Sequence, residues 1–132
     1  MKYLLDTNIC IYFFRGKFNM RERINTAGIE NCAISEITLA ELVYGAEHSA
    51  NSRKNHRLIS ELTDQIATIS IFDSILEYGR QKSRLRKEGI LISDFDLLIG
   101  STAIANKLTM VTQNTREFER LEGIELENWA IG

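Results

Sequence analysis

Short apolar runs alternate with longer segments of one-sided apolar spacing along the chain. Tyr3-Leu4-Leu5 is a short apolar run that ends at Asp6, which predicts a strand. Ile9 to Phe14 then shows the one-sided spacing of a helix that stops near Gly16. The same pattern predicts further helices over residues 19–27, 36–48, 51–64, 72–88 and 94–107 with a helical turn at 117–120, and further strands over 32–34, 67–71, 108–111 and 124–126.

Alternating strands and helices indicate the fold class. Parallel strands need a crossover connection, so this order favours a parallel sheet that helices cover on both faces. We therefore predict an α/β fold with three layers, α/β/α, around a short and mostly parallel sheet. No repeat, linker or low-complexity segment interrupts residues 1–132, which we expect to form a single domain.

Composition excludes several classes of protein. The chain has 132 residues, no proline and 44% hydrophobic residues, which excludes disordered and collagen-like chains. Cys10 and Cys32 lie in neither a CxxC nor a zinc-site spacing, so we interpret both as buried apolar residues of a protein in a reducing compartment. Apolar stretches stay below the ~20 residues that span a bilayer, and Asp6 comes too early for a signal peptide. The expected location is cytoplasmic.

Isolated carboxylates interrupt segments that otherwise look like core. No Lys, Arg or His within these segments offers a partner, and burying an unpaired carboxylate costs several kcal/mol or forces its protonation. Acids in such places therefore normally have a partner from elsewhere. The isolated acids are Asp6 between Lys2 and Arg15, Glu41 between Glu36 and Glu47, and Asp94 with Asp96 between Glu88 and Lys107.

Each of these acids also has a structural interpretation. Asp6 follows a predicted strand and is well placed to cap the next helix. Glu41 stands three residues after Thr38, which is the spacing of a capping box, although Thr38 is expected to lie inside a helix that begins near Ser35. Asp96 stands three residues after Ser93, which fits a capping box or a carboxylate that complements the helix dipole. Taken singly, such positions are more often structural than functional.

Taken together, the acids predict a cation site. The carboxyl ends of parallel strands converge on one crevice where ligands bind. Asp6 ends the first predicted strand, Ser35 ends the second just before the helix of Glu41, and Thr112 ends the strand at 108–111. Carboxylates gathered there repel one another unless a cation lies between them. Ligands that are all oxygen favour Mg²⁺ or Mn²⁺ over zinc.

Four segments of the chain carry a resemblance to a known family. These segments are Leu5–Asn8, Thr38–Gly45, Asp96–Ile99 and Val111–Phe118, with Glu127-Asn128-Trp129 as a further likeness near the C-terminal end. They resemble the four motifs of PIN-domain ribonucleases, and among these the VapC toxins of bacterial toxin–antitoxin pairs. The resemblance covers almost the whole chain and implies one PIN domain, Mg²⁺- or Mn²⁺-dependent endoribonuclease activity, a homodimer, and inhibition by a small VapB-type antitoxin in a larger assembly.

The resemblance assigns roles residue by residue. A metal held by Asp6 and Asp96 would activate water for attack on phosphorus, and Glu41 would orient that water or accept its proton, leaving a 5′-phosphate and a 3′-hydroxyl. Asn114 stands where many relatives have Asp, which makes Glu117 the nearest candidate for a fourth carboxylate and Asp94 an extra one. The residues expected to position these ligands are Thr7, Asn8, Thr112 and Asn114.

Basic residues offer candidate RNA contacts. Arg80, Arg84 and Lys87 fall on one stripe of the predicted helix 72–88, which suits either a solvated face or a ridge that contacts phosphates. Residues 53–57 form a second basic cluster. The formal charge of −2 argues against a protein that coats nucleic acid, although the acidity is concentrated where a cation is expected. By resemblance, the expected substrate is a tRNA anticodon stem-loop, with initiator tRNA the first candidate.

Three other interpretations stay open at this stage. A phosphorylation receiver is also a small parallel α/β domain with an acidic magnesium site, but Lys107 precedes its strand, whereas a receiver needs a Lys after it. A metal-free ribonuclease needs paired histidines, and His48 and His56 lie in a polar stretch and look like surface residues. A non-catalytic module with the same fold is the third. Only a metal-dependent nuclease would cleave RNA in a reaction that EDTA stops.

Overall fold

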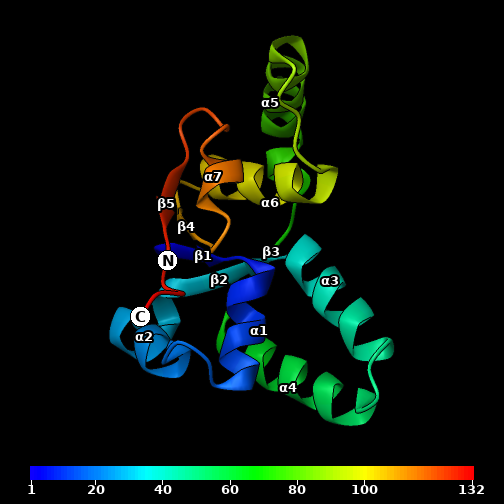
Figure 1. Cartoon of the computed structure of the whole chain (residues 1–132), viewed down its shortest axis with the longest axis vertical. Helices are drawn as coiled ribbons and strands as arrows, with labels where there is room; N and C mark the ends of the chain where they lie inside the picture. Colours follow the sequence, from blue (N-terminus) through cyan, green and yellow to red (C-terminus); the bar gives the residue numbers. More distant parts are fainter.

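A five-stranded sheet forms the centre of the computed structural model, which covers residues 1–132 (Figure 1). The strand order is β3-β2-β1-β4-β5, and all four neighbouring pairs are parallel. The predicted α/β class is therefore confirmed, with a sheet that is wholly parallel. The strands are β1 (Tyr3–Leu5), β2 (Cys32–Ser35), β3 (Ala67–Ile69), β4 (Thr109–Val111) and β5 (Glu125–Glu127).

The helices agree with the predicted segments to within a few residues at each end. None of them is long and apolar enough to cross a membrane. They are α1 (Thr7–Arg15), α2 (Met20–Ala27), α3 (Glu36–Glu47), α4 (Ser52–Gln65), α5 (Ile75–Glu88), α6 (Asp94–Ala105) and α7 (Thr115–Phe118), with 3₁₀ turns η1 (Ile29–Asn31) and η2 (Phe72–Ser74).

One predicted helix begins later than its sequence pattern indicates. Residues 72–88 were expected to be one helix after a strand over 67–71, but β3 stops at Ile69 and η2 precedes α5. The carboxylate of Glu36 on α3 accepts hydrogen bonds from the Ile71 amide at 2.8 Å and from the Ser70 hydroxyl at 3.3 Å. This contact from a distant helix holds residues 70–71 in a bend, so the regular helix starts only at Ile75.

Helices cover both faces of the sheet, as the three-layer prediction requires. Successive strand residues point to opposite faces, so Leu5 joins a core with residues of α1, α2 and α4, whereas Leu4 joins a core with residues of α5 and α6. Figure 1 shows α1, α2 and α4 on one side of the sheet and α5, α6 and α7 on the other. The carboxyl edge of the sheet lies between these two layers.

Both cysteines are free and buried, as predicted. Burial raises the pKa of both thiols, that of Cys32 to about 11. They are therefore protonated at neutral pH and act as small apolar side chains in the core around Leu5.

Candidate active site at the carboxyl edge of the sheet

Asp6 connects the central strand to the first helix. It follows β1 directly and caps α1, because its Oδ1 accepts a hydrogen bond from the Thr7 amide at 2.8 Å. Its Oδ2 accepts a hydrogen bond from the Thr112 hydroxyl at 2.7 Å. The side chain is only 4% exposed. The capping interpretation of Asp6 is therefore confirmed, and the second oxygen faces the end of β4.

Thr112 holds Asp6 from the neighbouring strand. It follows β4, is fully buried, and its Oγ1 also accepts a hydrogen bond from the Asn114 amide at 3.0 Å. Asn114 itself is exposed at the start of α7, and its side chain makes no capping bond there. The hydroxyl of Thr112 is thus committed to fixing one oxygen of Asp6.

Glu41 reaches the same edge from α3. Its Oε1 accepts a hydrogen bond of 2.6 Å from the Thr7 hydroxyl, so α1 and α3 both contribute to its position. Thr38 and Glu41 do not form a capping box, and Thr38 lies inside a helix that begins after Ser35, as predicted. Ser35 caps α3 instead, accepting a hydrogen bond from the Ile37 amide at 3.1 Å, and Thr38 lies buried inside the helix.

Asp96 lies in the first turn of α6. Ser93 caps this helix by accepting a hydrogen bond from the Asp96 amide at 3.2 Å, which confirms the Ser93 half of the expected capping box. The side chain of Asp96 is half-buried. A carboxylate at this end of a helix is stabilised by the helix dipole.

The carboxylates at this edge act on one another. Burial raises the pKa of Asp6, and the charges of Glu41 and Glu117 raise it further against hydrogen bonds that lower it. Burial likewise raises the pKa of Asp96 to about 6, with added contributions from Asp6, Glu117 and Glu41. None of these four acids has an ion pair with a Lys, Arg or His side chain. The excess negative charge therefore has no cationic partner within the protein.

The two weaker metal candidates differ in position. The exposed Glu117 on α7 contributes to the charge around both Asp6 and Asp96, whereas Asp94 does not. Asp94 accepts hydrogen bonds from the Lys82 ammonium at 2.8 Å and the Tyr78 hydroxyl at 2.9 Å, and the bond from Lys82 is the main cause of its lowered pKa. The structure thus brings Glu117 to the acidic edge and pairs Asp94 with α5.

Two further features bear on a cation. Asn8 has a buried Oδ1 atom without a hydrogen-bond partner. No group of three or more Asp, Glu, His or Cys side chains lies close enough together to hold a metal ion as a preformed cluster. The carboxylate oxygens match the ligands that Mg²⁺ and Mn²⁺ prefer, and their charge is uncompensated. The chemistry of the donor set therefore fits a divalent cation.

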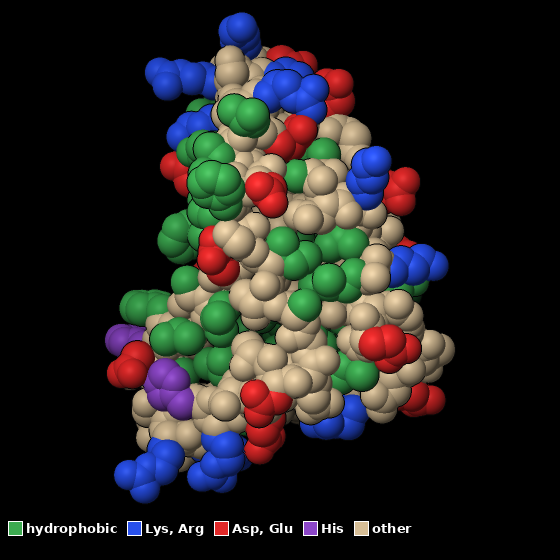
Figure 2. Space-filling model, turned by 180° about the vertical axis from the view of Figure 1, so that it is seen from behind, with side chains coloured by type: hydrophobic (Ala, Val, Ile, Leu, Met, Phe, Trp, Pro, Cys, Tyr) green, Lys and Arg blue, Asp and Glu red, His purple; other side chains and the backbone are tan.

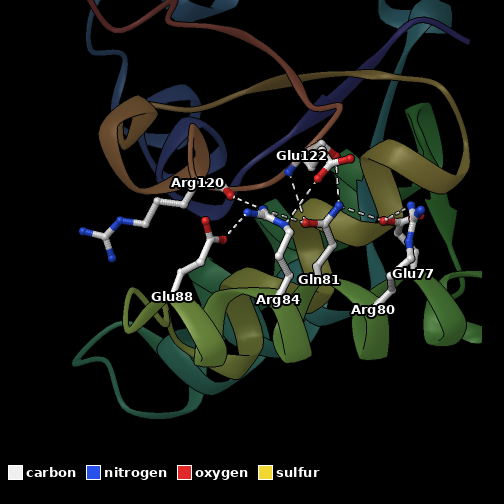
Figure 3. A network of polar contacts seen from close by, with 7 residues as sticks. All are labelled: Glu77, Arg80, Gln81, Arg84, Glu88, Arg120 and Glu122. Atoms are coloured by element: carbon white, nitrogen blue, oxygen red, sulfur yellow. Dashed lines mark hydrogen bonds and ion pairs between the residues drawn. The ribbon is translucent and has the colours of Figure 1, made fainter.

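The basic stripe on α5 is largely engaged within the protein (Figure 3). Arg80 forms an ion pair with Glu77 at 2.6 Å. Arg84 bonds to Glu88 at 2.7 Å and donates to the Arg120 carbonyl, whereas Lys87 has no ion pair. Sequence spacing places these side chains on one face but does not show which of them is occupied by contacts from other elements.

The histidines do not form an acid–base pair. His56 contacts Glu47 at 3.1 Å, and His48 stacks on Tyr44 with ring centroids 5.8 Å apart. This arrangement agrees with the interpretation of both as residues outside a catalytic dyad.

A groove lies beside Glu41 and was not predicted from the sequence. The groove has a volume of about 530 Å³ and lies between α1, α3 and α4. Apolar residues form much of its lining, and Arg15 and Lys54 supply positive charge. Its lining includes Ile11, Phe14, Leu42, Leu58 and Ile59, residues whose helical spacing alone suggests only core positions.

Comparison with known proteins adds the family. A model of the PIN domain matches residues 3–124. The tRNA(fMet)-specific endonuclease VapC of Shigella flexneri is 36% identical over 132 residues, covering 98% of this chain and 99% of that protein. Ribonuclease VapC2 of Rickettsia felis is 38% identical over 137 residues, covering 98% of each. The chain belongs to the PIN-domain family of VapC ribonucleases.

Solved structures of VapC-family complexes share the fold. The VapBC2 complex of Rickettsia felis bound to a promoter DNA fragment contains a chain with 34% identity and a TM-score of 0.90, covering 98% of this chain and 99% of that one. The DNA-bound VapBC complex of Salmonella typhimurium gives 33% identity and a TM-score of 0.91 with 98% coverage of both. The prediction of a VapC-family enzyme that hydrolyses RNA is confirmed, and the receiver alternative is wrong.

Proposed function

We propose that this VapC-family ribonuclease is the toxin of a type II toxin–antitoxin pair. It acts in the cytoplasm as a Mg²⁺-dependent endoribonuclease, with Mn²⁺ able to substitute, and a VapB-type antitoxin inhibits it. The observation that supports the proposal is the group of carboxylates at the carboxyl edge of the sheet, where burial and then the charges of neighbouring acids raise the pKa of Asp6 and Asp96 and no basic side chain forms an ion pair with them. A divalent cation is the partner that this charge requires.

Each acidic residue has a defined task in this proposal. Asp6 and Asp96 hold the ion, with Glu117 as an additional ligand. When bound there, a divalent ion would supply a lower pKa for a coordinated water molecule and positive charge beside the scissile phosphate. Glu41 orients the attacking water or accepts its proton, and the 2.6 Å bond from Thr7 fixes the carboxylate for this purpose.

Neighbouring side chains keep these ligands in position. Thr112 fixes one oxygen of Asp6 through its 2.7 Å hydrogen bond, and Thr7 fixes Glu41. Asn8 and Asn114 lie next to them in the chain and complete the set of polar residues assigned to this role. Residues of this kind orient metal ligands and raise affinity without touching the ion.

The proposed substrate is a structured RNA, with a tRNA anticodon stem-loop first among the candidates. Two relatives, from Shigella flexneri and Salmonella typhimurium, are named tRNA(fMet)-specific endonucleases. A loop presents unpaired nucleotides whose backbone can enter an acidic crevice, which a continuous duplex cannot do as easily. Lys87, with Arg80 and Arg84 where their internal contacts allow, is proposed to contact phosphates from α5.

The groove beside Glu41 is the proposed place of antitoxin contact. Glu41 is part of its lining, together with apolar residues of α1, α3 and α4 and the basic residues Arg15 and Lys54. A partner segment with apolar side chains and an acidic flank would fill it and cover Glu41. The solved complexes that match this fold contain VapB together with VapC, which supports a partner of that type.

The proposed homodimer has an apolar surface available to it. Figure 2 shows hydrophobic side chains along the edge formed by α5 and α3. Phe72 is 77% exposed and Leu76 is 88% exposed, which is unusual for side chains of this size. The exposed apolar residues of this edge include Val43, Tyr44, Phe72, Ile75 and Leu76.

The first experiment measures cleavage with and without a divalent ion. Purified protein should cut RNA in Mg²⁺ or Mn²⁺ and should stop in EDTA. Asp6→Asn and Asp96→Asn should fold, form dimers and show no cleavage. Asp94→Asn is the matched control, because it also neutralises a carboxylate in α6 but leaves the acidic edge intact, and it should keep its activity. Cleavage that survives EDTA, or cleavage by either folded site variant, contradicts the proposal.

A second experiment identifies the RNA. Cellular RNA is sequenced for new 5′ ends after a brief induction of the protein, with Asp6→Asn as the inactive control. One dominant position in a tRNA anticodon loop agrees with the proposed substrate. Cuts scattered over many transcripts contradict tRNA specificity and leave the nuclease assignment to the first experiment.

A further inference from the structure

Two side chains of α5 hold the connection between α7 and β5. Gln81 is only 2% exposed, and its side-chain amide pairs with the backbone of Glu122 in both directions. Its Nε2 donates to the Glu122 carbonyl at 2.9 Å, and its Oε1 accepts from the Glu122 amide at 3.1 Å. The guanidinium of Arg84 donates to the Arg120 carbonyl. Figure 3 shows both side chains pointing from α5 toward this segment.

The side-chain amide of Gln81 has no unused hydrogen-bonding group. Its Nε2 also donates to Glu77 at 2.8 Å, and its Oε1 also accepts from Arg84 at 3.2 Å. All donors and acceptors of the buried amide are therefore used, which fixes its orientation. A buried amide with this complete set of partners positions the backbone it touches, because any shift of Glu122 would break two bonds at once.

The segment held in this way is joined directly to an acidic residue of the proposed site. Residues 120–122 follow α7, and α7 carries Glu117. Phe118 and Leu121, on either side of this junction, are buried in the core that also contains Leu97 of α6. Holding residues 120–122 therefore fixes how α7 lies against α6.

Contact between α7 and α6 is close and specific. A Cβ atom at Gly100 of α6 would lie 2.2 Å from Leu121 Cδ1 and 3.4 Å from Phe118 Cδ1. The absence of a side chain at Gly100 thus lets the segment approach the helix that carries Asp96. Gly100 follows Asp96 by about one turn of α6, and Phe118 directly follows Glu117, so the two carboxylates are carried by the segments that meet at this contact. The spacing between them depends on where residues 120–122 are held.

We propose that Gln81 and Arg84 are positioning residues of the acidic site. They hold residues 120–122 against α5, and this sets the place of Glu117 opposite Asp96 and strengthens the binding of a divalent cation. The inference rests on the proposed function and adds residues on the far side of α7 to it. It also gives the occupied guanidinium of Arg84 a task other than RNA contact.

The test measures the affinity for Mn²⁺ alone, by calorimetry or by electron paramagnetic resonance, without RNA. Gln81→Met has a similar length and no hydrogen bonds, and it should weaken Mn²⁺ binding by about fivefold, which is less than the ~10–100-fold lost when a residue bonded directly to a ligand is removed. Glu117→Gln should weaken binding by roughly tenfold. The double variant should be no weaker than Glu117→Gln, because Gln81 acts through Glu117.

Arg86→Met is the matched control. It removes an exposed basic group from the same helix that forms no ion pair and does not touch the Gln81 network, so its Mn²⁺ affinity should equal that of the wild type. Arg84→Met provides an independent variant at a more exposed position if Gln81→Met unfolds, and it should also lose affinity only when Glu117 is present.

The outcomes separate this inference from the function on which it rests. If the wild type binds Mn²⁺ and both Gln81→Met and Arg84→Met keep an affinity within twofold of the wild type, the inference alone is overturned. If the loss of Mn²⁺ affinity in a double variant equals the product of the two single losses, the inference is also overturned, because the network then acts on stability in general. A wild type that binds no Mn²⁺ overturns the proposed metal-dependent function together with it.

Discussion

Replacing Asp96 with Asn is expected to stabilise the protein while it removes cleavage. Burial, then the charges of Asp6, Glu117 and Glu41, raises the pKa of Asp96 from 3.8 to about 6. Above pH 6 the folded protein therefore carries an ionised group whose charge is less favourable there than in the unfolded chain. Asparagine has nearly the same shape and no charge, so the variant loses this cost together with a proposed metal ligand.

The size of the effect follows from the pKa and the exposure of the side chain. One pH unit of pKa difference corresponds to about 1.4 kcal/mol, which gives an upper bound of about 3 kcal/mol. Asp96 is only half-buried, and solvent screening reduces this to about 1.5 kcal/mol. Losing the favourable position at the start of α6 subtracts about 0.5 kcal/mol. The expected gain is about 1 kcal/mol, or a rise in Tm of about 3–5 °C.

Thermal unfolding between pH 4 and pH 8 in EDTA measures this gain. The folded pKa lies above the unfolded one, so the stabilisation that protonation of Asp96 gives the wild type is complete below about pH 4 and is lost as the pH rises through 6. The advantage of Asp96→Asn should therefore be largest at pH 7.5 and should shrink toward pH 4. A variant that is less stable at pH 7.5, or an advantage that does not change with pH, would refute this reasoning. Asp94→Asn is the control, and its change in thermal stability at pH 7.5 should have the opposite sign. Lys82 lowers the pKa of Asp94, so the folded protein favours the charge that this variant removes.

The other predictions concern separate parts of the molecule. Thr7→Val removes the hydroxyl bonded to Glu41 and should lower the single-turnover cleavage rate by about tenfold, with RNA affinity unchanged in a filter-binding assay. An unchanged rate would show that Glu41 needs no such support. Gly100→Ala should cost about 1–3 kcal/mol in urea unfolding, because its Cβ meets a buried side chain. Gly79→Ala, at an exposed position of α5 with nothing within 4 Å, should be neutral or stabilising by comparison. Leu76→Glu should give a monomer in light scattering, and a dimer of this variant would place the interface elsewhere.

Local pattern was sufficient for most of the fold. Short apolar runs and one-sided spacing predicted the strands and helices, because β1, β2 and β4 are buried on both faces and most helices on one. The failure at residues 70–74 has a definite cause. The carboxylate of Glu36 reaches the Ile71 amide from another helix, and no periodicity within residues 67–88 records that contact.

The sequence pattern predicted the candidate site to a similar extent. Asp6, Glu41 and Asp96 are conspicuous because each interrupts an apolar segment that contains no basic residue. The hydrogen bond that joins Thr112 to Asp6 spans 106 positions, and its existence depends on the pairing of β1 with β4. Arg84 shows the converse, since helical spacing suggested a free basic face and the structure shows its guanidinium bonded to the Arg120 carbonyl. The spacing of residues along a helix shows which side chains share a face. Whether those side chains are engaged in contacts depends on segments far away in the chain.

The central position of β1 has a consequence for biosynthesis. β1 is synthesised before β4, but β4 is one of its two neighbours, with Tyr3 opposite Thr109. Pairings of such long sequence separation form slowly in folding. A nascent chain that lacks β4 holds Asp6 without Thr112 and has no Glu117. The acidic edge can therefore assemble only after synthesis has passed α7.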